Sequence, residues 1–181
     1  MELPDSGEDV RARTFAALVD RRALDRAYRT ARLILGDPSE AEDATHDAAL
    51  SAWRRFSELR DPERFEAWFG RILINACRDR LRARRRLPVS VDAPGVHPLG
   101  DAPTADAADA VARRELLRGA VMSLSPVHRE VVVLRFYADL TIDQIAERTR
   151  VRAGTVKSRL HHALRRLRDE VETAGEGRAA R

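Results

Sequence analysis

Residues 89–108 constrain the fold of this chain more than any other feature. They form a segment without apolar periodicity that holds three prolines and two glycines, Pro94, Gly95, Pro98, Gly100 and Pro103. Proline lacks a backbone N–H and glycine has little conformational preference, so neither a helix nor a strand is expected there. The pattern predicts a flexible linker, and the chain must therefore fold as two separate units, which we place at residues 10–88 and 109–171.

The first of these units carries the apolar spacing of helices. Apolar side chains recur at intervals of three and four, at Leu24, Ala27, Tyr28, Ala31, Ile34 and Leu35. Gly36 ends this run. Asp37 can cap the next helix, Pro38 suits a first helical position because proline lacks an N–H, and Glu40 stands at the capping-box position. We expect that second helix to end at about Phe56.

Asp61 and Pro62 repeat this arrangement and precede one wide apolar stripe. The stripe comprises Phe65, Trp68, Phe69, Ile72, Leu73 and Ala76. Cys77 continues the stripe, so a buried structural thiol is expected rather than a nucleophile or a redox sensor. No strand-like alternation competes, and the first unit is predicted to be a small helical bundle.

The second unit is also predicted to be helical. A helix over residues 110–122 is followed by Ser125 and Pro126, a cap and a first helical residue, which outweigh the strand-like "VVVL" after them. Thr141 and Gln144 match a capping box. The apolar residues of a helix-turn-helix then follow at Ile142, Ile145, Ala146, Val151, Val156 and Leu160. The fold class is therefore all-α, two small helical bundles, with a short disordered tail at residues 172–181.

The charge pattern of this helix pair suggests DNA binding. From Arg148 to Arg168 the chain has eight basic residues and no acidic one, and the whole protein has a pI near 10.1. Such a helix can contact phosphates on both sides of a groove. A solvated charged face is the alternative. His161 and His162 do not suggest a metal site, because adjacent helical residues diverge by about 100° and no further ligand follows. No cofactor is expected.

The first unit combines an acidic helix start with a basic helix end. Five carboxylates gather at Asp37, Glu40, Glu42, Asp43 and Asp47, and six arginines lie between residues 78 and 86. Helix-dipole compensation explains the first carboxylates, but Asp47 lies about two turns into its helix and favours a partner surface. The arginines repel one another unless a polyanion neutralises them, or they form a flexible basic tail. Two partners are indicated, a protein and a nucleic acid.

The remaining composition points to the cytoplasm. A single cysteine cannot form an internal disulfide, and no stretch approaches the roughly 20 apolar residues of a membrane span. The N-terminus "MELPDSGEDVRAR" is acidic and lacks the apolar run of a secretory signal. We expect a cytoplasmic protein without membrane insertion.

Three stretches, in this order across the expected linker, resemble the extracytoplasmic-function (ECF) sigma factors of bacterial RNA polymerase. "GDPSEAEDATHDAALSAW" is similar to the polymerase-binding part of sigma region 2, and "FEAWFGRILINACRDRLRARRR" to its promoter-melting and minus-10 helix. "LSPVHREVVVLRFYADLTIDQIAERTRVRAGTVKSRLHHALRRLR" is similar to region 4, which reads the minus-35 element. The likeness covers about residues 15 to 170.

The resemblance implies a promoter-specificity subunit that is not an enzyme and needs no cofactor. It implies core polymerase binding through Asp43, His46, Asp47 and Leu50. It implies that the minus-10 strand is bound by Arg60, Arg64, Trp68, Arg71, Asn75, Arg78 and Arg82. It implies that the minus-35 duplex is read by Arg152, Thr155, Lys157, Ser158, His161, His162 and Arg165. An anti-sigma factor is a further expected partner.

This chain departs from the family pattern at four positions. His46 stands where the family usually has glutamine, and Ala49 where an aromatic residue is usual. Arg150 replaces a turn glycine, and Arg152 replaces a serine or proline that caps the recognition helix. These departures bear on promoter preference more than on the fold.

Three other functions fit parts of the sequence. A stand-alone helix-turn-helix activator shares the last helix pair, but a phosphorylation-switched one needs a receiver unit with alternating strands. A sigma-like decoy would bind a regulatory partner and no promoter, which the basic recognition helix disfavours. A nucleic-acid enzyme needs a second carboxylate cluster or a Cys/His metal set, and the spacing provides neither.

Overall fold

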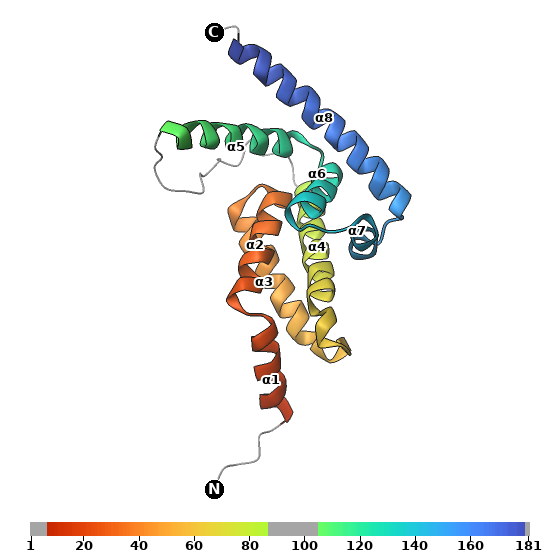
Figure 1. Ribbon diagram of the computed structural model, residues 1–181. Helices are drawn as coiled ribbons and strands as arrows, with labels where there is room; N and C mark the ends of the chain where they lie inside the picture. Colours follow the sequence, from red (N-terminus) through yellow and green to blue (C-terminus); the bar gives the residue numbers. More distant parts are fainter. Residues whose placement is uncertain (1–6, 87–104, 180–181) are drawn as a thin grey trace. The chain divides into compact units, whose positions relative to one another are not determined.

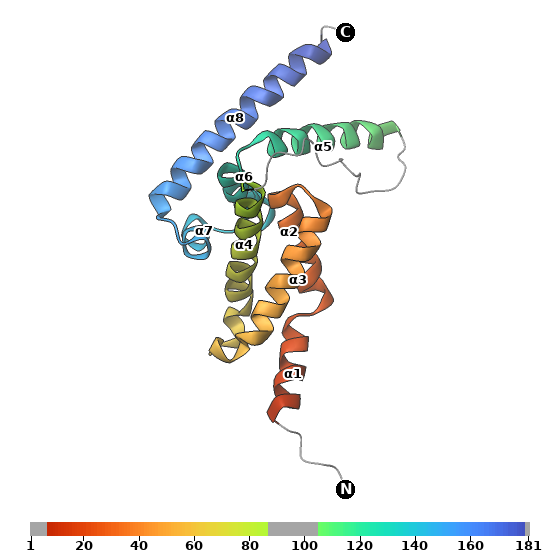
Figure 2. The same cartoon turned by 180° about the vertical axis from the view of Figure 1, so that it is seen from behind.

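The computed structural model describes residues 7–86 and 105–179, and these residues contain helices and no strand. The chain divides into two compact units, Met1–Pro88 and Val89–Arg181 (Figure 1, Figure 2). The predicted all-α class is confirmed. Of the expected linker, residues 89–104 lie outside the described residues, and the last four belong to a helix that begins at Ala105, five residues earlier than predicted.

The first unit is a three-helix bundle with an additional N-terminal helix. Helices α2, α3 and α4 pack against one another, as Figure 1 shows. The elements are α1 (Gly7–Leu18), α2 (Arg21–Leu35), α3 (Pro38–Arg54), the short 3₁₀ helices η1 (Phe56–Glu58) and η2 (Pro62–Arg64), and α4 (Phe65–Arg84). Helix α3 therefore stops two residues short of the predicted end, and two short 3₁₀ helices, η1 and η2, separate it from α4.

The core of this bundle lies between a face of small residues and a face of large ones. On α3 the side chains that face inward are fully buried alanines, namely Ala41, Ala44, Ala48 and Ala52. Alanine lets helix axes approach closely, so the aromatic and branched residues of α4 fill the remaining space. The predicted stripe on α4 is confirmed at Phe65, Phe69, Ile72 and Leu73, and Cys77 is buried as expected. Trp68 and Ala76 are only half-buried.

The predicted signals at the junction of α2 and α3 are confirmed, with one correction. Gly36 has φ of 81°, and its N–H donates to the Arg32 carbonyl. The Asp37 side chain accepts a hydrogen bond of 2.9 Å from the Glu40 N–H. Glu40 does not complete a capping box: its carboxylate accepts from Arg84 Nε, because an ionised partner offers a stronger hydrogen bond than a backbone N–H.

In the second unit three helices pack against one long helix. Helices α5, α6 and α7 each contact α8. The elements are α5 (Ala105–Ser123), α6 (Pro126–Val132), the π-helix η3 (Val133–Tyr137), α7 (Ile142–Thr149) and α8 (Ala153–Ala179). The "VVVL" stretch is helical, as predicted. Ser125 occupies the N-cap position of α6, but its side chain makes no capping hydrogen bond, contrary to expectation.

The helix-turn-helix is formed by α7 and α8. Thr141 Oγ1 accepts from the Gln144 N–H at 3.2 Å, and Gln144 Oε1 accepts from the Thr141 N–H at 2.9 Å, which confirms the predicted capping box. Ile145 and Val156 are fully buried between the two helices, and Thr149 is also buried. Its hydroxyl donates to the Ile145 carbonyl and is thus satisfied within α7.

Helix α8 is longer than the sequence predicts. The sequence predicts a disordered tail from residue 172, yet α8 continues to Ala179. Residues 153–179 contain no proline, and arginine, glutamate and alanine are good helix formers. Ser123 of α5 also donates to Glu170, which holds this part of α8 against α5.

Arg150, at the turn between α7 and α8, has left-handed backbone angles, φ 54° and ψ 39°. A side chain with Cβ costs about 1 kcal/mol there relative to glycine. We expect Arg150→Gly to raise the free energy of unfolding by up to about 1 kcal/mol in chemical denaturation. Arg150→Ala removes the same side chain but keeps Cβ, and it should give no gain. An equal gain in both variants would assign the effect to charge.

Candidate protein and nucleic-acid interfaces

One exposed strip on α3 carries the four residues assigned to polymerase. Asp43, His46, Asp47 and Leu50 follow the spacing of a single helix face, and all four are exposed. Leu50 has 40% of its surface accessible, so an apolar side chain lies in the open next to two carboxylates and an imidazole. This combination of one exposed apolar residue and charged neighbours suits a protein contact better than a purely solvated face.

Arg80 of α4 binds both aspartates of this strip. Its Nη1 lies 2.9 Å from Asp43 Oδ2, and its Nη2 lies 2.6 Å from Asp47 Oδ2. Burial by itself lowers the pKa of Arg80, but the hydrogen bonds and charges of the two aspartates outweigh burial, so the pKa is raised. The guanidinium therefore remains charged and holds both carboxylates in one orientation. The sequence pattern did not reveal this pairing, because the partners are more than thirty positions apart.

The basic end of α4 is largely paired with the protein's own carboxylates. Arg84 Nε contacts Glu40 at 2.5 Å, and its Nη2 lies 3.8 Å from Asp37 Oδ2. Arg82 pairs with Asp79 one turn away, at 2.7 Å. These arginines therefore do not all need a polyanion to offset their repulsion, contrary to the expectation from the sequence, since acidic residues of α3 and α4 neutralise several of them.

The residues assigned to the minus-10 strand lie on α4 and on the segment before it. Five of them, Trp68, Arg71, Asn75, Arg78 and Arg82, follow each other on α4 at intervals of three and four. Arg60 and Arg64 are exposed and lie just before α4, on the segment that contains η2. Arg82 is also exposed, whereas the other four are half-buried. Arg80 points in the opposite direction from Arg71, about 180° around the axis of α4, on the side that faces α3.

The residues assigned to the minus-35 duplex gather on the first half of α8 or directly before it. Arg152 precedes the helix, and Lys157, Ser158, His161 and Arg165 are exposed on it. Thr155 is half-buried, and its N–H donates to the Arg152 carbonyl at the start of the helix. The structure thus presents a basic, solvent-facing surface on the second helix of the helix-turn-helix.

A stack of histidines adjoins this surface. The ring of His162 lies over that of His128 from α6, with centroids 6.4 Å apart, and it meets the edge of His161 at 5.7 Å. Within residues 7–86 and 105–179, no three His, Cys, Asp or Glu side chains converge as a metal site. Burial lowers the pKa of His128, and the charges of His162, Arg159 and Arg166 on α8 lower it further.

The lowered pKa of His128 predicts a pH-dependent stability. An unfolded histidine binds a proton at about pH 6.5, whereas folded His128 does so only at lower pH. Between these two pH values the unfolded state binds more protons than the folded state, so the free energy of unfolding falls as the pH decreases. The fall ends once folded His128 is also protonated. We expect the melting temperature to fall as the pH decreases from about 7, and His128→Gln to reduce this dependence. An unchanged slope in His128→Gln would contradict this cause.

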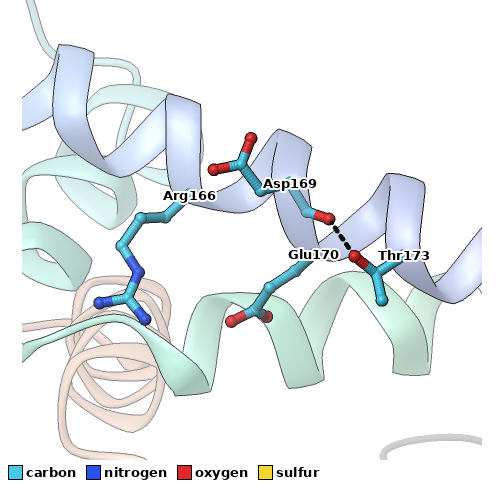
Figure 3. Close-up of a pocket in the computed structure, with 4 residues that line it drawn as sticks. All are labelled: Arg166, Asp169, Glu170 and Thr173. Carbon is cyan, nitrogen blue, oxygen red and sulfur yellow. Dashed lines mark hydrogen bonds between the residues drawn. The ribbon is translucent and has the colours of Figure 1, made fainter.

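Figure 3 shows a shallow depression farther along α8, lined by Arg166, Asp169, Glu170 and Thr173. The Thr173 hydroxyl donates to the Asp169 carbonyl at 2.8 Å, and Glu170 is bound by Ser123. The depression is open to solvent. It lies where the basic stretch of α8 ends and acidic residues begin.

Comparisons with known proteins identify the family. The family models "Sigma-70 region 2" and "Sigma-70, region 4" match residues 19–87 and 120–169. An RNA polymerase sigma-E factor of Streptomyces avermitilis is 34% identical over 153 residues, or 84% of this chain and 83% of that protein. The ECF RNA polymerase sigma factor SigL of Mycobacterium tuberculosis is 33% identical over 151 residues, or 82% and 84% of the two chains.

Solved structures share this fold. The sigma factor RpoE, solved with the anti-sigma factor NepR from Bartonella quintana, has a TM-score of 0.68 at 21% identity, over 83% of this chain and 92% of that one. CnrH, solved with the cytosolic domain of CnrY, has a TM-score of 0.59 at 25% identity, over 90% of each chain. No described helix has the length and apolarity that crossing a membrane requires. The chain belongs to the ECF sigma factors of RNA polymerase, which are transcription initiation factors and not enzymes.

Proposed function

We propose that this sigma factor brings core RNA polymerase to promoters and helps to melt them through three surfaces. The α3 strip of Asp43, His46, Asp47 and Leu50 binds polymerase, the α4 face with Arg60 and Arg64 binds the unpaired minus-10 strand, and the start of α8 reads the minus-35 duplex. The observation that carries the proposal is the placement of the first two surfaces. They lie on different helices of one bundle, so protein and single strand can bind at the same time.

The minus-10 surface has the composition that single-stranded DNA requires. Trp68 offers a half-buried ring near Arg71 on the same helix face, and arginine contacts to phosphates add an electrostatic contribution. Asn75 contributes an amide that can donate and accept hydrogen bonds on a base edge. Binding at this surface offsets part of the free energy of separating the strands.

The minus-35 surface combines charges with groups that read bases. Arg152, Lys157 and Arg165 are exposed around the start of α8 and can contact phosphates. Ser158 and His161 are exposed on the same stretch and can form hydrogen bonds in the major groove. His162 stacks on His128, which fixes its ring and makes it a less adaptable reader than His161.

We also propose a partner of the anti-sigma class, by analogy with the sigma factor RpoE, which was solved in complex with an anti-sigma factor. The exposed Leu50 makes the α3 strip suitable for such a partner, which would then compete with polymerase. We place the chain in the cytoplasm, where RNA polymerase acts, and we keep residues 10–88 and 109–171 as its functional domains.

Run-off transcription with purified core polymerase tests this function. A product that starts at one promoter and requires both chain and core supports the sigma role. DNA binding without polymerase association would favour a stand-alone activator instead. Binding to a regulatory protein, without any promoter-specific product, would favour a decoy.

A further inference from the structure

Helix α1 lies before the part of the chain that the region 2 family model matches, residues 19–87. Three of its residues, Arg11, Phe15 and Leu18, are partly buried on one face, whereas Val10 is 50% exposed. The helix is thus held against the bundle through a single narrow face. Nothing in the proposed polymerase or DNA surfaces accounts for this contact.

Phe15 of α1 inserts between two aromatic rings at the end of α3. Its centroid lies 5.2 Å from Trp53 at an interplanar angle of 65°, and 5.2 Å from Phe56 at 76°. Both pairs have the edge-to-face geometry that aromatic rings prefer. Trp53 belongs to the last turn of α3, and Phe56 begins η1, so Phe15 joins two consecutive elements that the main chain connects only through Arg55.

Arg11, one turn before Phe15 on α1, also contacts Trp53. Its Nη2 donates to the Trp53 carbonyl at 3.0 Å, and its guanidinium carbon lies 5.1 Å from the centre of the Trp53 ring. The last carbonyls of a helix lack intrahelical donors, and a cation is favourable at that end. Arg11 therefore acts as a cap for α3 that comes from another helix.

The segment that α1 holds leads directly to the proposed DNA residues. Short 3₁₀ helices such as η1 are weakly stable by themselves, and η1 is supported locally by the Arg55–Glu58 ion pair. After η1 the chain continues through Arg60 to η2 and Arg64. Fixing Phe56 thus restricts where these two exposed arginines can lie.

We propose that α1 is a positioning element for promoter opening: Phe15 and Arg11 fix the end of α3 and η1, so that Arg60 and Arg64 are held ready for the unpaired strand. This inference rests on the proposed minus-10 surface. Preorganisation of this kind increases the rate of strand capture, because the segment does not have to be ordered during melting. It leaves the α3 strip for polymerase unaffected.

The test compares full-length Phe15→Ala with Val10→Ala, a change on the exposed face of the same helix. Open-complex formation with core polymerase is followed on a duplex promoter and on the same promoter with a pre-melted minus-10 segment. We expect Phe15→Ala to slow opening of the duplex about tenfold, to have a smaller effect on the pre-melted template, and to leave core affinity within about twofold. Val10→Ala should match the unchanged protein.

Further variants separate the outcomes. Phe15→Leu keeps an apolar side chain and should restore most of the rate, which also covers the case that Phe15→Ala folds poorly. Equal loss of core affinity and opening in both Phe15 variants would show a general structural role and overturn the proposal. Faster opening in Phe15→Ala would show that α1 covers the aromatic rings instead of positioning the segment, and would also overturn it.

The double variant Arg60→Ala/Arg64→Ala distinguishes this inference from the proposed function. If it opens both templates normally, the minus-10 assignment fails. If it slows opening while Phe15→Ala does not, the assignment holds and the role of α1 is wrong.

Discussion

Replacing Asp43 and Asp47 together by lysine is expected to weaken association with core polymerase about 100-fold, while binding to a minus-35 duplex remains unchanged. The reversal removes two carboxylates from the proposed contact. A partner surface that is complementary to the carboxylates is positive, and it would repel the two lysines. Charge changes of this kind at a protein interface typically cost 2–5 kcal/mol, and about 2.7 kcal/mol corresponds to a factor of 100. Titration of labelled core polymerase with full-length protein measures the first effect, and anisotropy of labelled duplex measures the second.

The double variant also affects stability, because two lysines would face the Arg80 guanidinium and destabilise the α3–α4 contact. A loss of affinity could therefore come from the fold or from the interface. The triple variant Asp43→Lys/Asp47→Lys/Arg80→Glu solves this problem, since the glutamate can pair with both lysines. It should regain the stability of the unchanged protein but not its affinity for polymerase. If affinity returns together with stability, the aspartates act through the fold and do not contact the partner.

A matched control carries the same change in net charge away from the strip. Asp25→Lys/Glu42→Lys alters two exposed acidic residues, one on α2 and one on α3 outside the strip. We expect it to retain core affinity. An equal loss in this control would mean that polymerase responds to the overall charge of the domain, and the four-residue strip would then have no special role.

The acidic start of α3 contains features that could be predicted from the sequence and one that could not. Capping by Asp37, the end of α2 at Gly36 and the capping box at Thr141 were predictable, because each depends on residues within four positions. The pairing of Arg80 with Asp43 and Asp47 was not, because it requires two helices to pack in a particular register. Periodicity shows which face of a helix is buried but not which partner residue it meets.

The same limit explains the parts of the site that were missed. Helix α1 lacks a strong apolar stripe, and its contacts to Trp53 and Phe56 span about forty positions. The stack of His162 on His128 likewise joins residues of two different helices. The exposure of the basic residues of α8 was predictable, since they lie close together in the sequence and a solvent-facing side chain needs no packing partner.

Lys157 and His161 should differ in the way they affect minus-35 binding, although only one turn of α8 separates them. Lys157→Ala removes a charge without base information, so affinity should fall similarly for all sequences. The slope of log affinity against log salt should decrease in magnitude by about 1. His161→Ala removes a group that can bond to one base edge. It should cost about 1–3 kcal/mol on the preferred sequence, or roughly 5- to 150-fold, and little on a duplex changed at that base pair.

The two variants are compared on a panel of duplexes with every single substitution in the minus-35 element, at several salt concentrations. His162→Ala is the informative control, because its ring is held over His128 and it should change base preference less than His161→Ala. If Lys157, His161 and His162 variants all lose affinity uniformly, then α8 binds phosphates only, and promoter choice must reside in the minus-10 surface. Base-specific loss confined to His161→Ala would instead place sequence reading on the exposed face of α8, where the charges hold the helix in the groove and the imidazole selects the base.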